Sequence, residues 1–293
     1  MNLALVTSQV LAQYASNQDD EDSLLLRYLR EQGHHVDYCL WTDPAVNWRQ
    51  YDVVVLKSPW DYFDRVGEFY QWLDSLDQLG VRLLNPTATV RWNADKKYLR
   101  DMEQAGVRIV PTHWLPQGSS FHPDELFAQL ATERLVVKPA VSGGAKNTFD
   151  LNRAEATHRA PELTALLAHE DYLAQPFQPQ IQLQGEWSLI YLGGAFSHCV
   201  LKAPKAGDFR VQHYLGGSIE PREAPASLRA TADRIVRDFA PGCLYARVDG
   251  LQDTNGELLL MELELIEPFL YLESGGQSAY ARYEQGLRLA AAH

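Results

Sequence analysis

Acidic and apolar residues alternate near the C-terminus, in the stretch LLMELELIEP at positions 259–268. Successive side chains of a strand point to opposite faces, so Glu262 and Glu264 would share one face. The other face would carry the apolar residues Leu259, Met261, Leu263 and Leu265. Like charges about 7 Å apart on one face repel each other unless a positive charge lies over them. The simplest alternative is a half-exposed strand whose polar face contacts water.

The stretch YARVDGLQDTNGELL, directly upstream, predicts a hairpin that turns at its Asn-Gly pair. With those two residues as the loop, Asp249 would lie opposite Glu262, and Arg247 opposite Glu264, all on one face. Oxygen ligands at this spacing suit Mg²⁺, which usually takes one or two carboxylates and completes its shell with water and phosphate. The pattern therefore predicts a metal site formed by Asp249, Glu262 and Glu264 that accepts a phosphate compound.

The segment VVKPAVSGGA places Lys138 at the end of a buried strand, before a glycine-rich turn. Backbone N–H groups of Ser142, Gly143 and Gly144 could wrap phosphate oxygens, and the lysine would supply a positive charge. The spacing differs from that of a Walker loop, and an ordinary surface loop is the alternative. Arg210, in AGDFRVQHYLGG, adds a cation beside a flexible stretch or else forms a surface ion pair.

Another polar group, KSPWDY, follows the strand predicted over 51–56. Ligands in open α/β sheets bind beyond the carboxyl ends of the strands. The predicted substrate contacts in this group are Lys57, Ser58, Trp60, Asp61 and Tyr62. An N-cap and aromatic anchor for the next helix is the alternative. Lys202 and Glu267 are assigned to the same substrate site from their placement, although the two could form an ordinary ion pair.

Composition excludes several classes of function. The 293 residues carry a formal net charge of -12, which disfavours nonspecific binding to nucleic acid or to anionic membranes. The three cysteines are dispersed, so neither a disulfide framework nor a zinc site is indicated. The first residues lack a basic region with a long apolar core, and no apolar run approaches the length of a membrane span. We therefore expect a cytoplasmic protein.

Strand and helix patterns alternate along the chain, which predicts an α/β fold. Strands are expected at 3–6, 36–40, 51–56, 81–86, 134–140 and 172–177, and a second hairpin around 193–194. Helices are expected over 22–31, 67–79, 92–106, 123–130, 160–168, 226–239 and 278–291.

The order of these motifs resembles that of the ATP-grasp superfamily, in its glutathione-synthetase-like and ribosomal-modification-ligase-like branch. The motifs are, in order, NADKKYL, VVKP, SGG, QPF, GE and GDFR, followed by the strand aspartate and the two glutamates. The resemblance implies an open α/β pre-ATP-grasp domain (1–112), a small central lid domain (113–180) and a C-terminal antiparallel-sheet domain with the metal and phosphate site (181–293). A finer resemblance, carried by KSPWDYF, NPTATVRWNADKKYL, SHCVLKAPKAGDFRVQ and ELELIEP, is to the cyclo-ligases of cycloserine biosynthesis, which act on O-ureido-serine.

The resemblance also assigns roles to single residues. It implies that ATP contacts Lys96, with Lys97 as the alternative, and Lys138. The loop that closes over the phosphates would be Ser142, Gly143, Gly144 and Ala145. Adenine would bind to the backbone of Gln175, Pro176 and Phe177, with Glu186 nearby. Arg210 would face the γ-phosphate, Arg247 would stabilise the developing charge, and Asp249, Glu262 and Glu264 would hold Mg²⁺. In the commoner form of the family, Asn stands where Glu264 is.

The implied activity is carbon–nitrogen ligation driven by ATP and Mg²⁺, with Mn²⁺ as a substitute, through an acyl phosphate. The substrates would be a small-molecule carboxylate and an amine, from an amino acid or its derivative, and could belong to one molecule that cyclises. A small-molecule kinase on the same fold and a noncatalytic nucleotide-binding protein are the alternatives. The family's frequent dimers and tetramers predict self-association, and no nucleic-acid or membrane partner is expected.

Overall fold

The computed structural model describes residues 1–9, 15–205 and 217–292. The chain has a mixed α/β fold with three sheets, which confirms the predicted fold class. It divides into two compact units, one of residues 1–94 with 180–293 and one of residues 95–179. The division into three domains predicted from the sequence stays a prediction.

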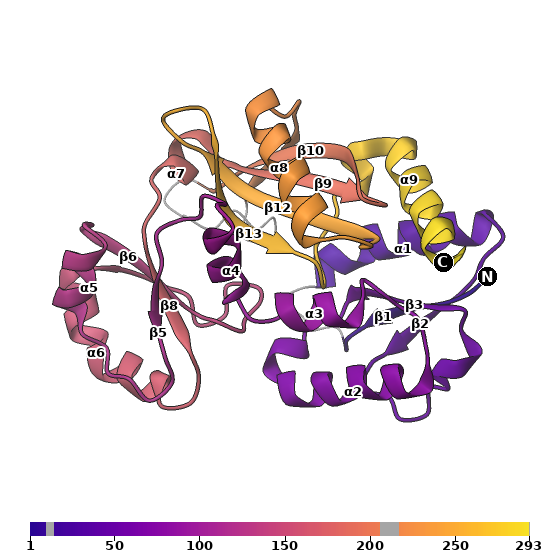
Figure 1. The fold of residues 1–293 in the computed structure, drawn as a ribbon, viewed down its shortest axis with the longest axis horizontal. Helices are drawn as coiled ribbons and strands as arrows, with labels where there is room; N and C mark the ends of the chain where they lie inside the picture. The colour runs from indigo at the N-terminus through magenta and orange to yellow at the C-terminus, as the bar shows by residue number, and fades with distance from the viewer. Residues whose placement is uncertain (10–14, 206–216, 293) are drawn as a thin grey trace. The chain divides into compact units, whose positions relative to one another are not determined.

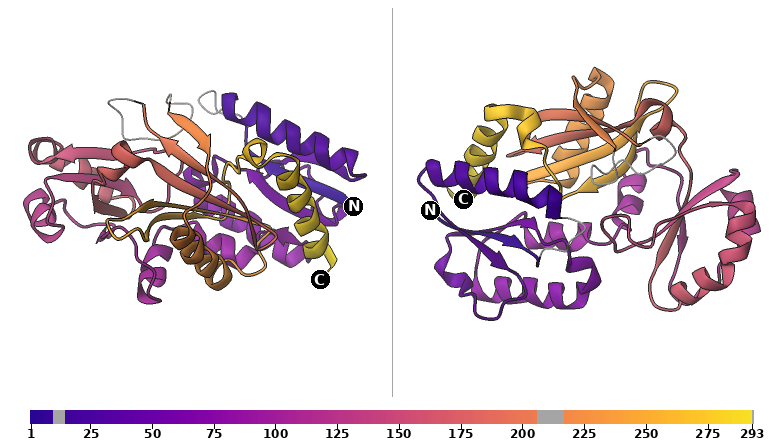
Figure 2. Two further views of the ribbon diagram at one scale, coloured as in Figure 1. Left: turned by 90° about the horizontal axis from the view of Figure 1, so that it is seen from above. Right: turned by 180° about the vertical axis from the view of Figure 1, so that it is seen from behind.

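The first sheet is parallel and buried on both faces (Figure 1). Its strand order is β2 (His35–Leu40), β1 (Asn2–Thr7), β3 (Val53–Ser58) and β4 (Leu83–Leu84). One face packs against α2 (Val66–Leu79) and α3 (Thr87–Asn93), and the other against α1 (Ala15–Glu31) and α9 (Leu272–Ala292). Figure 2 shows α1 and α9 side by side. Two short 3-10 helices, Trp48–Gln50 and Tyr62–Asp64, flank β3.

The second sheet is antiparallel and belongs to the same unit. Its order is β11 (Ser218–Pro221), β10 (Ala195–Ala203), β9 (Glu186–Leu192), β12 (Tyr245–Gln252) and β13 (Leu258–Glu264). The helix α8 (Ala226–Phe239) contacts β9, β12 and β13, and the short α7 (Gln180–Gln184) precedes β9. Ala195 pairs with Leu192, so the hairpin predicted around 193–194 is confirmed.

Five residues, 253–257, connect β12 and β13. The N–H of Asp253 donates to the carbonyl of Glu257 at 2.9 Å, so the turn closes around three residues, 254–256, and not around the two predicted. A β-bulge then shifts the register by one residue: Gly250 lies opposite Leu260, but Asp249 lies opposite Glu262. This shift compensates for the extra residue in the turn. The predicted pairs are therefore confirmed: Asp249 lies opposite Glu262, and Arg247 lies opposite Glu264.

This bulge changes the faces of β13. Leu259 lies opposite Leu251 and packs with it and Met261 in a small apolar cluster. Leu263 and Leu265 are buried in the other face. The prediction that Leu259 and Met261 share a face with Leu263 and Leu265 is wrong, because a bulge adds a residue and reverses the alternation of side chains.

The second unit holds the third sheet, with the order β5 (His113–Leu115), β8 (Tyr172–Pro176), β6 (Arg134–Pro139) and β7 (Phe149–Asn152). The helices α5 (Pro123–Gln129) and α6 (Arg153–Leu167) pack on it around one apolar core, as Figure 2 shows from behind. The helix expected over 160–168 begins earlier, because a capping box of Asn152 and Glu155 starts it at Arg153.

The helix predicted over 92–106 is interrupted. The chain forms α3, then a turn that carries Lys96 and Lys97, then α4 (Tyr98–Gln104). The N–H of Lys96 donates to the carbonyl of Ala140 at 2.9 Å, and the N–H of Lys97 donates to Asp95 at 2.9 Å. These bonds replace intrahelical ones, so a local pattern typical of one helix is overridden by tertiary contacts.

Two buried asparagines hold the end of β13. Asn93 donates to the carbonyl of Leu263 at 2.8 Å and accepts from the N–H of Leu265 at 3.0 Å. Asn85 donates to the carbonyls of Leu265 and Tyr245 at 2.8 and 2.9 Å. The strand that carries the paired glutamates is thus anchored in the same unit as the first sheet. None of the helices in the described part of the chain is both long and apolar enough to cross a membrane.

Candidate active site

Side chains of alternating charge cross the second sheet from β10 to β13. The ammonium of Lys202 lies 2.6 Å from Glu186 and 3.5 Å from Asp249. Arg247 lies 2.8 Å from Asp249 and also pairs with Glu264. Because opposed residues of an antiparallel pair share a face, β9, β10, β12 and β13 bring these five predicted site residues together.

The guanidinium of Arg247 is held on several sides. Its Nε and Nη2 donate to Asp249, and its Nη1 donates to the carbonyl of Phe269 at 2.9 Å. The carbon Cζ lies 5.7 Å from the centre of the Tyr271 ring. Arg247 is only 7% exposed, so its charge acts in a setting that excludes most water.

Burial and neighbouring charge set the protonation of the acids. Burial alone would raise the pKa of Asp249, but Arg247 and Lys202 outweigh it and lower that pKa to about 2. Burial raises the pKa of Glu264 to about 7; Asp249 and Glu262 add to the rise, and Arg247 opposes it. Burial also raises the pKa of Glu186, against the effect of Lys202. Asp249 therefore stays ionised near neutral pH.

The donor set on β13 fits a hard cation with few protein ligands. Glu262 and Glu264 are both partly exposed, and Mg²⁺ needs only one or two carboxylates besides water and phosphate oxygens. Asp249 is 2% exposed, and its oxygens accept from Arg247 and Ser188. Across the described ranges, no three His, Cys, Asp or Glu side chains form a group that could hold a metal. The assignment of Asp249 as a third ligand stays a prediction.

The residues of KSPWDY are partly used within the protein. Trp60 donates to the carbonyl of Glu267 at 3.1 Å, and Asp61 accepts from Trp41 at 2.6 Å. Tyr62 is buried, which raises its pKa, and the charges of Glu267, Glu262 and Glu264 add to the rise. Tyr62 is therefore affected by the charges of the predicted metal-binding glutamates.

Lys57 and Ser58 face two acids that the sequence reasoning missed. Lys57 is 2% exposed, and its ammonium lies 2.8 Å from Glu21 and 2.9 Å from Asp22. Ser58 is fully buried and donates to Asp22 at 2.6 Å. Acidic residues in the middle of α1 look like ordinary helix residues in the sequence, so only the fold reveals this pairing. Lys202 likewise pairs with Glu186 and lies 3.5 Å from Asp249.

In the second unit, Lys96 and Lys97 differ in their surroundings. Lys96 is 7% exposed and donates to the carbonyl of Ser142 at 2.8 Å. Lys97 pairs with Asp171 and lies 3.4 Å from Asp95. Lys96 therefore contacts the predicted phosphate loop, whereas Lys97 belongs to an ion-pair group.

The predicted phosphate loop follows β6, which carries Lys138. Gly144 and Ala145 have φ angles of 59° and 60°, a left-handed conformation that glycine adopts freely and alanine rarely. The hydroxyl of Ser142 donates to the carbonyl of Pro139 at 3.3 Å. Successive turns of this kind can direct backbone N–H groups toward an anion.

The predicted adenine segment lies at the end of β8. Gln175 is 5% exposed and its side chain donates to Thr112 at 2.9 Å. The N–H of Phe177 donates to the carbonyl of Arg134 at 2.8 Å, and the guanidinium of Arg134 lies 3.8 Å from the centre of the Phe177 ring. The segment is therefore held in extended form beside β6.

Two further residues of the site carry no sequence signal. Ser188 hydrogen-bonds to Asp249, and Tyr271 covers the guanidinium of Arg247. A serine on a strand and a tyrosine in a loop are too common to single out without a structure. Arg210, predicted to face the γ-phosphate, lies outside the described residues.

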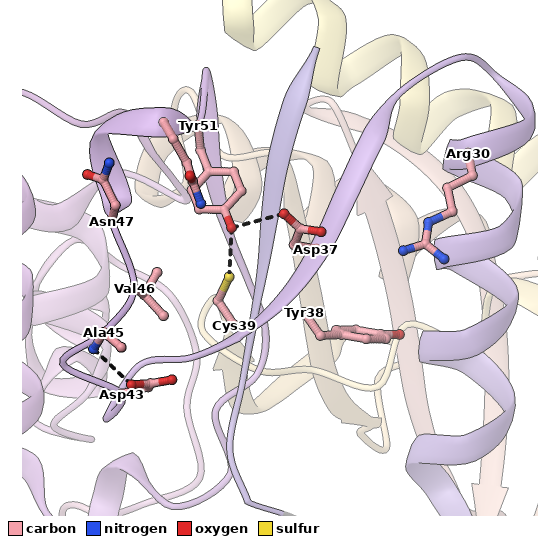
Figure 3. Close-up of a pocket in the computed structure, with 10 residues that line it drawn as sticks. Arg30, Asp37, Tyr38, Cys39, Asp43, Ala45, Val46, Asn47 and Tyr51 are labelled. Carbon is pink, nitrogen blue, oxygen red and sulfur yellow. Dashed lines mark hydrogen bonds between the residues drawn. The ribbon is translucent and has the colours of Figure 1, made fainter.

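A pocket of about 400 Å³ also lies on the first sheet, and its lining contains none of the predicted site residues (Figure 3). Its lining includes Arg30, Asp37, Cys39 and Tyr51. The hydroxyl of Tyr51 donates to Asp37 at 3.1 Å and lies 3.3 Å from the sulfur of Cys39. These groups satisfy one another, and nothing in the pocket points to catalysis.

Comparison with known proteins gives matches along the chain. The family profile "D-cycloserine synthetase DcsG, N-terminal domain" matches residues 3–85. The cycloserine biosynthesis protein DcsG of Streptomyces lavendulae is 29% identical over 299 residues, which cover 97% of each chain.

Solved structures also match nearly the whole chain. The crystal structure of D-cycloserine synthetase DcsG has a TM-score of 0.86 and 28% identity, covering 99% of this chain and 100% of that one. A D-alanine–D-alanine ligase from Bacillus anthracis complexed with ATP has a TM-score of 0.74 at 16% identity, with 100% and 97% covered. A RimK domain ATP-grasp protein from Sphaerobacter thermophilus has a TM-score of 0.69 at 16% identity, with 98% and 99% covered.

Proposed function

We propose that this chain, an ATP-grasp protein homologous to the D-cycloserine synthetase DcsG along almost its whole length, is an ATP-dependent ligase that forms a carbon–nitrogen bond. The observation that carries the proposal is the group of alternating charges on the second sheet. It places two buried cations and a pair of partly exposed carboxylates on one face. Such a face suits the transfer of a phosphoryl group, which depends on positioning and charge neutralisation.

ATP is assigned to the cations and the loop of the second unit. Lys96 and Lys138 would contact phosphate oxygens, and backbone N–H groups of the loop 142–145 would add further donors. The segment 175–177 would bind adenine, with Glu186 as a further nucleotide contact. Arg210 keeps its proposed place against the γ-phosphate.

Glu262 and Glu264 would hold Mg²⁺, and Mn²⁺ would substitute for it because both are hard cations that prefer oxygen ligands. When bound, the metal neutralises negative charge on phosphate oxygens. Arg247 lies beside Glu264 and would stabilise charge that develops during transfer. Asp249 orients Arg247 and Lys202 through its contacts with both.

The proposed reaction has two steps. A carboxylate oxygen of the substrate attacks the γ-phosphorus of ATP, the bond to the β-phosphate oxygen breaks, and ADP leaves. An amine then attacks the carbonyl carbon of the acyl phosphate, inorganic phosphate leaves, and the amine loses a proton. No covalent nucleophile of the protein is needed, because the residues bind, orient and neutralise charge.

We assign the substrate to the class of amino acids and their derivatives, including molecules that carry both the carboxylate and the amine and so cyclise. Trp60, Asp61, Tyr62 and Glu267 would form part of its site. Lys57, Ser58 and Lys202, which the structure buries in ion pairs and hydrogen bonds, would act on the substrate through the residues they hold.

The test is release of phosphate from ATP and Mg²⁺ with a panel of amino acids, ureido amino acids and dipeptides. We expect one carboxylate-bearing compound to stimulate release and the mass of its product to show a new carbon–nitrogen bond. Glu262→Ala should abolish the stimulated release, whereas Glu257→Ala, which removes an exposed carboxylate just before β13, should not.

Two results would contradict the proposal. ADP formation with a stable phosphorylated product and no free phosphate would indicate a kinase. The chain could also bind ATP without turning over any compound of the panel. If its Glu262→Ala variant then binds ATP equally well, a noncatalytic nucleotide-binding protein is favoured.

A further inference from the structure

The segment that holds Arg247 contains a residue in an unusual conformation. Tyr271 has a φ angle of 51°, in the left-handed region that bulky side chains rarely adopt. Its ring lies beside Arg247, and the carbonyl of Phe269, two residues earlier, accepts from Arg247. A strained residue of this kind persists only where the surrounding structure over-determines it.

The carboxylate of Glu21 supplies that constraint, because it binds the backbone on both sides of Tyr271. One oxygen accepts from the N–H of Leu270 at 2.9 Å, and the other accepts from the N–H of Leu272 at 3.1 Å. Glu21 is 2% exposed, so water does not compete for these bonds. The carbonyl of Leu270 is held too, by the Nε2–H of His198 at 2.9 Å.

Lys57 completes the arrangement. Its ammonium lies 2.8 Å from the Glu21 oxygen that also accepts from Leu270. A buried carboxylate needs a compensating cation, and an ionised carboxylate can only accept hydrogen bonds. Glu21 therefore presents two acceptor oxygens at once, which an amide in its place could not do.

We propose that Glu21 is a positioning residue for the ligase reaction, which holds the segment 269–272 so that Phe269 and Tyr271 fix the guanidinium of Arg247. This inference rests on the proposed function of the site. Arg247 stabilises transition-state charge only if its orientation is set before the reaction. Glu21 acts through the segment and touches no predicted ATP residue.

The variant Glu21→Gln keeps the size of the side chain but replaces one acceptor oxygen with an NH₂ group, which cannot accept from Leu270 or Leu272. We expect kcat for substrate-stimulated phosphate release to fall about 10- to 100-fold, as for a misplaced catalytic group. The KM for ATP should stay unchanged. The matched control is Glu284→Gln, because Glu284 is a largely buried carboxylate of the same unit that binds His34 at 3.0 Å. Its activity should equal that of the wild type.

A double-mutant cycle separates positioning from general destabilisation. If Glu21 acts through Arg247, Glu21→Gln should have little further effect on kcat in an Arg247→Lys background. An additive loss, or an unchanged kcat in the single variant, would overturn the inference. If Glu21→Gln does not fold, His198→Phe replaces it, because this variant removes the bond from His198 to the carbonyl of Leu270 in the same segment. An additive loss with Arg247→Lys, or an unchanged kcat in His198→Phe alone, would then overturn the inference.

Hydrogen exchange gives a readout that does not depend on activity. At least one of the amides of Leu270 and Leu272 should lose protection in Glu21→Gln, because glutamine keeps a single acceptor oxygen, and both should keep it in Glu284→Gln. Equal protection in both variants would overturn the inference even if kcat falls. If the wild-type protein releases no phosphate with any compound, the ligase proposal is contradicted instead. The exchange result would still show whether Glu21 holds the segment 269–272.

Discussion

Lys96 and Lys97 are adjacent in the sequence, but the structure gives them different partners. We expect Lys96→Met to weaken ATP binding about 10- to 100-fold, the loss of one charge-assisted hydrogen bond. Lys97→Met should leave ATP affinity unchanged, because the ammonium of Lys97 pairs with Asp171. Titration calorimetry with ATP checks both variants. A larger loss in Lys97→Met than in Lys96→Met would reverse the assignment of the ATP lysine.

His198 gives a prediction on the pH dependence of stability. Burial lowers its pKa, while bonds to the backbone of Leu270 and Tyr271 oppose the shift. The unfolded chain takes up a proton near pH 6.5 and the folded chain only at lower pH. The neutral form therefore stabilises the fold fully above pH 6.5, and this contribution is lost as the pH falls toward the folded pKa.

Urea unfolding at several pH values between 7 and 5 should show this loss. The stability advantage of the wild type over His198→Phe should shrink as the pH falls, since phenylalanine does not titrate. A constant difference between the two proteins across this range would show that His198 keeps its ordinary pKa.

At the scale of elements, the β12–β13 hairpin depends on a glycine at its bulge. A Cβ atom at Gly250 would lie 2.7 Å from the carbonyl oxygen of Leu259 and 2.7 Å from the side chain of Leu258. We expect Gly250→Ala to lower the free energy of unfolding by about 1–3 kcal/mol through overpacking. In Gly67→Ala the new methyl group would meet no atom within 4 Å, and helix α2 should be unchanged or more stable. Denaturant melts of the two variants provide the comparison.

The asparagine that holds the end of β13 should matter for both stability and activity. Asn93→Ala leaves the carbonyl of Leu263 and the N–H of Leu265 without their partner, at a cost of about 2–4 kcal/mol. Phosphate release should fall as well, because β13 carries Glu262 and Glu264. Asn152→Ala removes an exposed helix cap, which costs about 1 kcal/mol, and should leave activity intact. Full activity in a folded Asn93→Ala protein would show that the anchor is not needed for the site.

At the scale of the whole molecule, all three cysteines lie in the interior, each no more than 6% exposed. Burial raises the pKa of Cys199 and that of Cys243 to about 12, so neither forms a thiolate near neutral pH. We expect a thiol reagent to label the native protein very slowly and to label every cysteine after unfolding in guanidinium chloride. Rapid labelling of native protein would indicate that the core opens readily.

The sequence by itself determined most strands of the fold and the pairing of charged residues on the β12–β13 hairpin. The Asn-Gly turn and the alternating strand pattern predicted that Asp249 lies opposite Glu262, and the structure confirms it. The longer loop and the bulge offset each other, so the predicted pairing of Asp249 with Glu262 is confirmed. The predicted face of Leu259 and Met261 is wrong, because the bulge reverses the alternation of side chains before it. Short-range pairing of this kind is predictable because turn chemistry and strand periodicity are local.

Only the tertiary structure decided which groups compensate the charges. Glu21 and Leu270 are 249 residues apart, and no local pattern connects them. The helix expected over 92–106 is interrupted at Lys96 because the N–H of Lys96 bonds to the carbonyl of Ala140. The ring beside Arg247 belongs to Tyr271, whose conformation Glu21 maintains. Contacts between distant segments depend on how the whole chain packs, because a buried charge takes whichever partner the packing brings within reach.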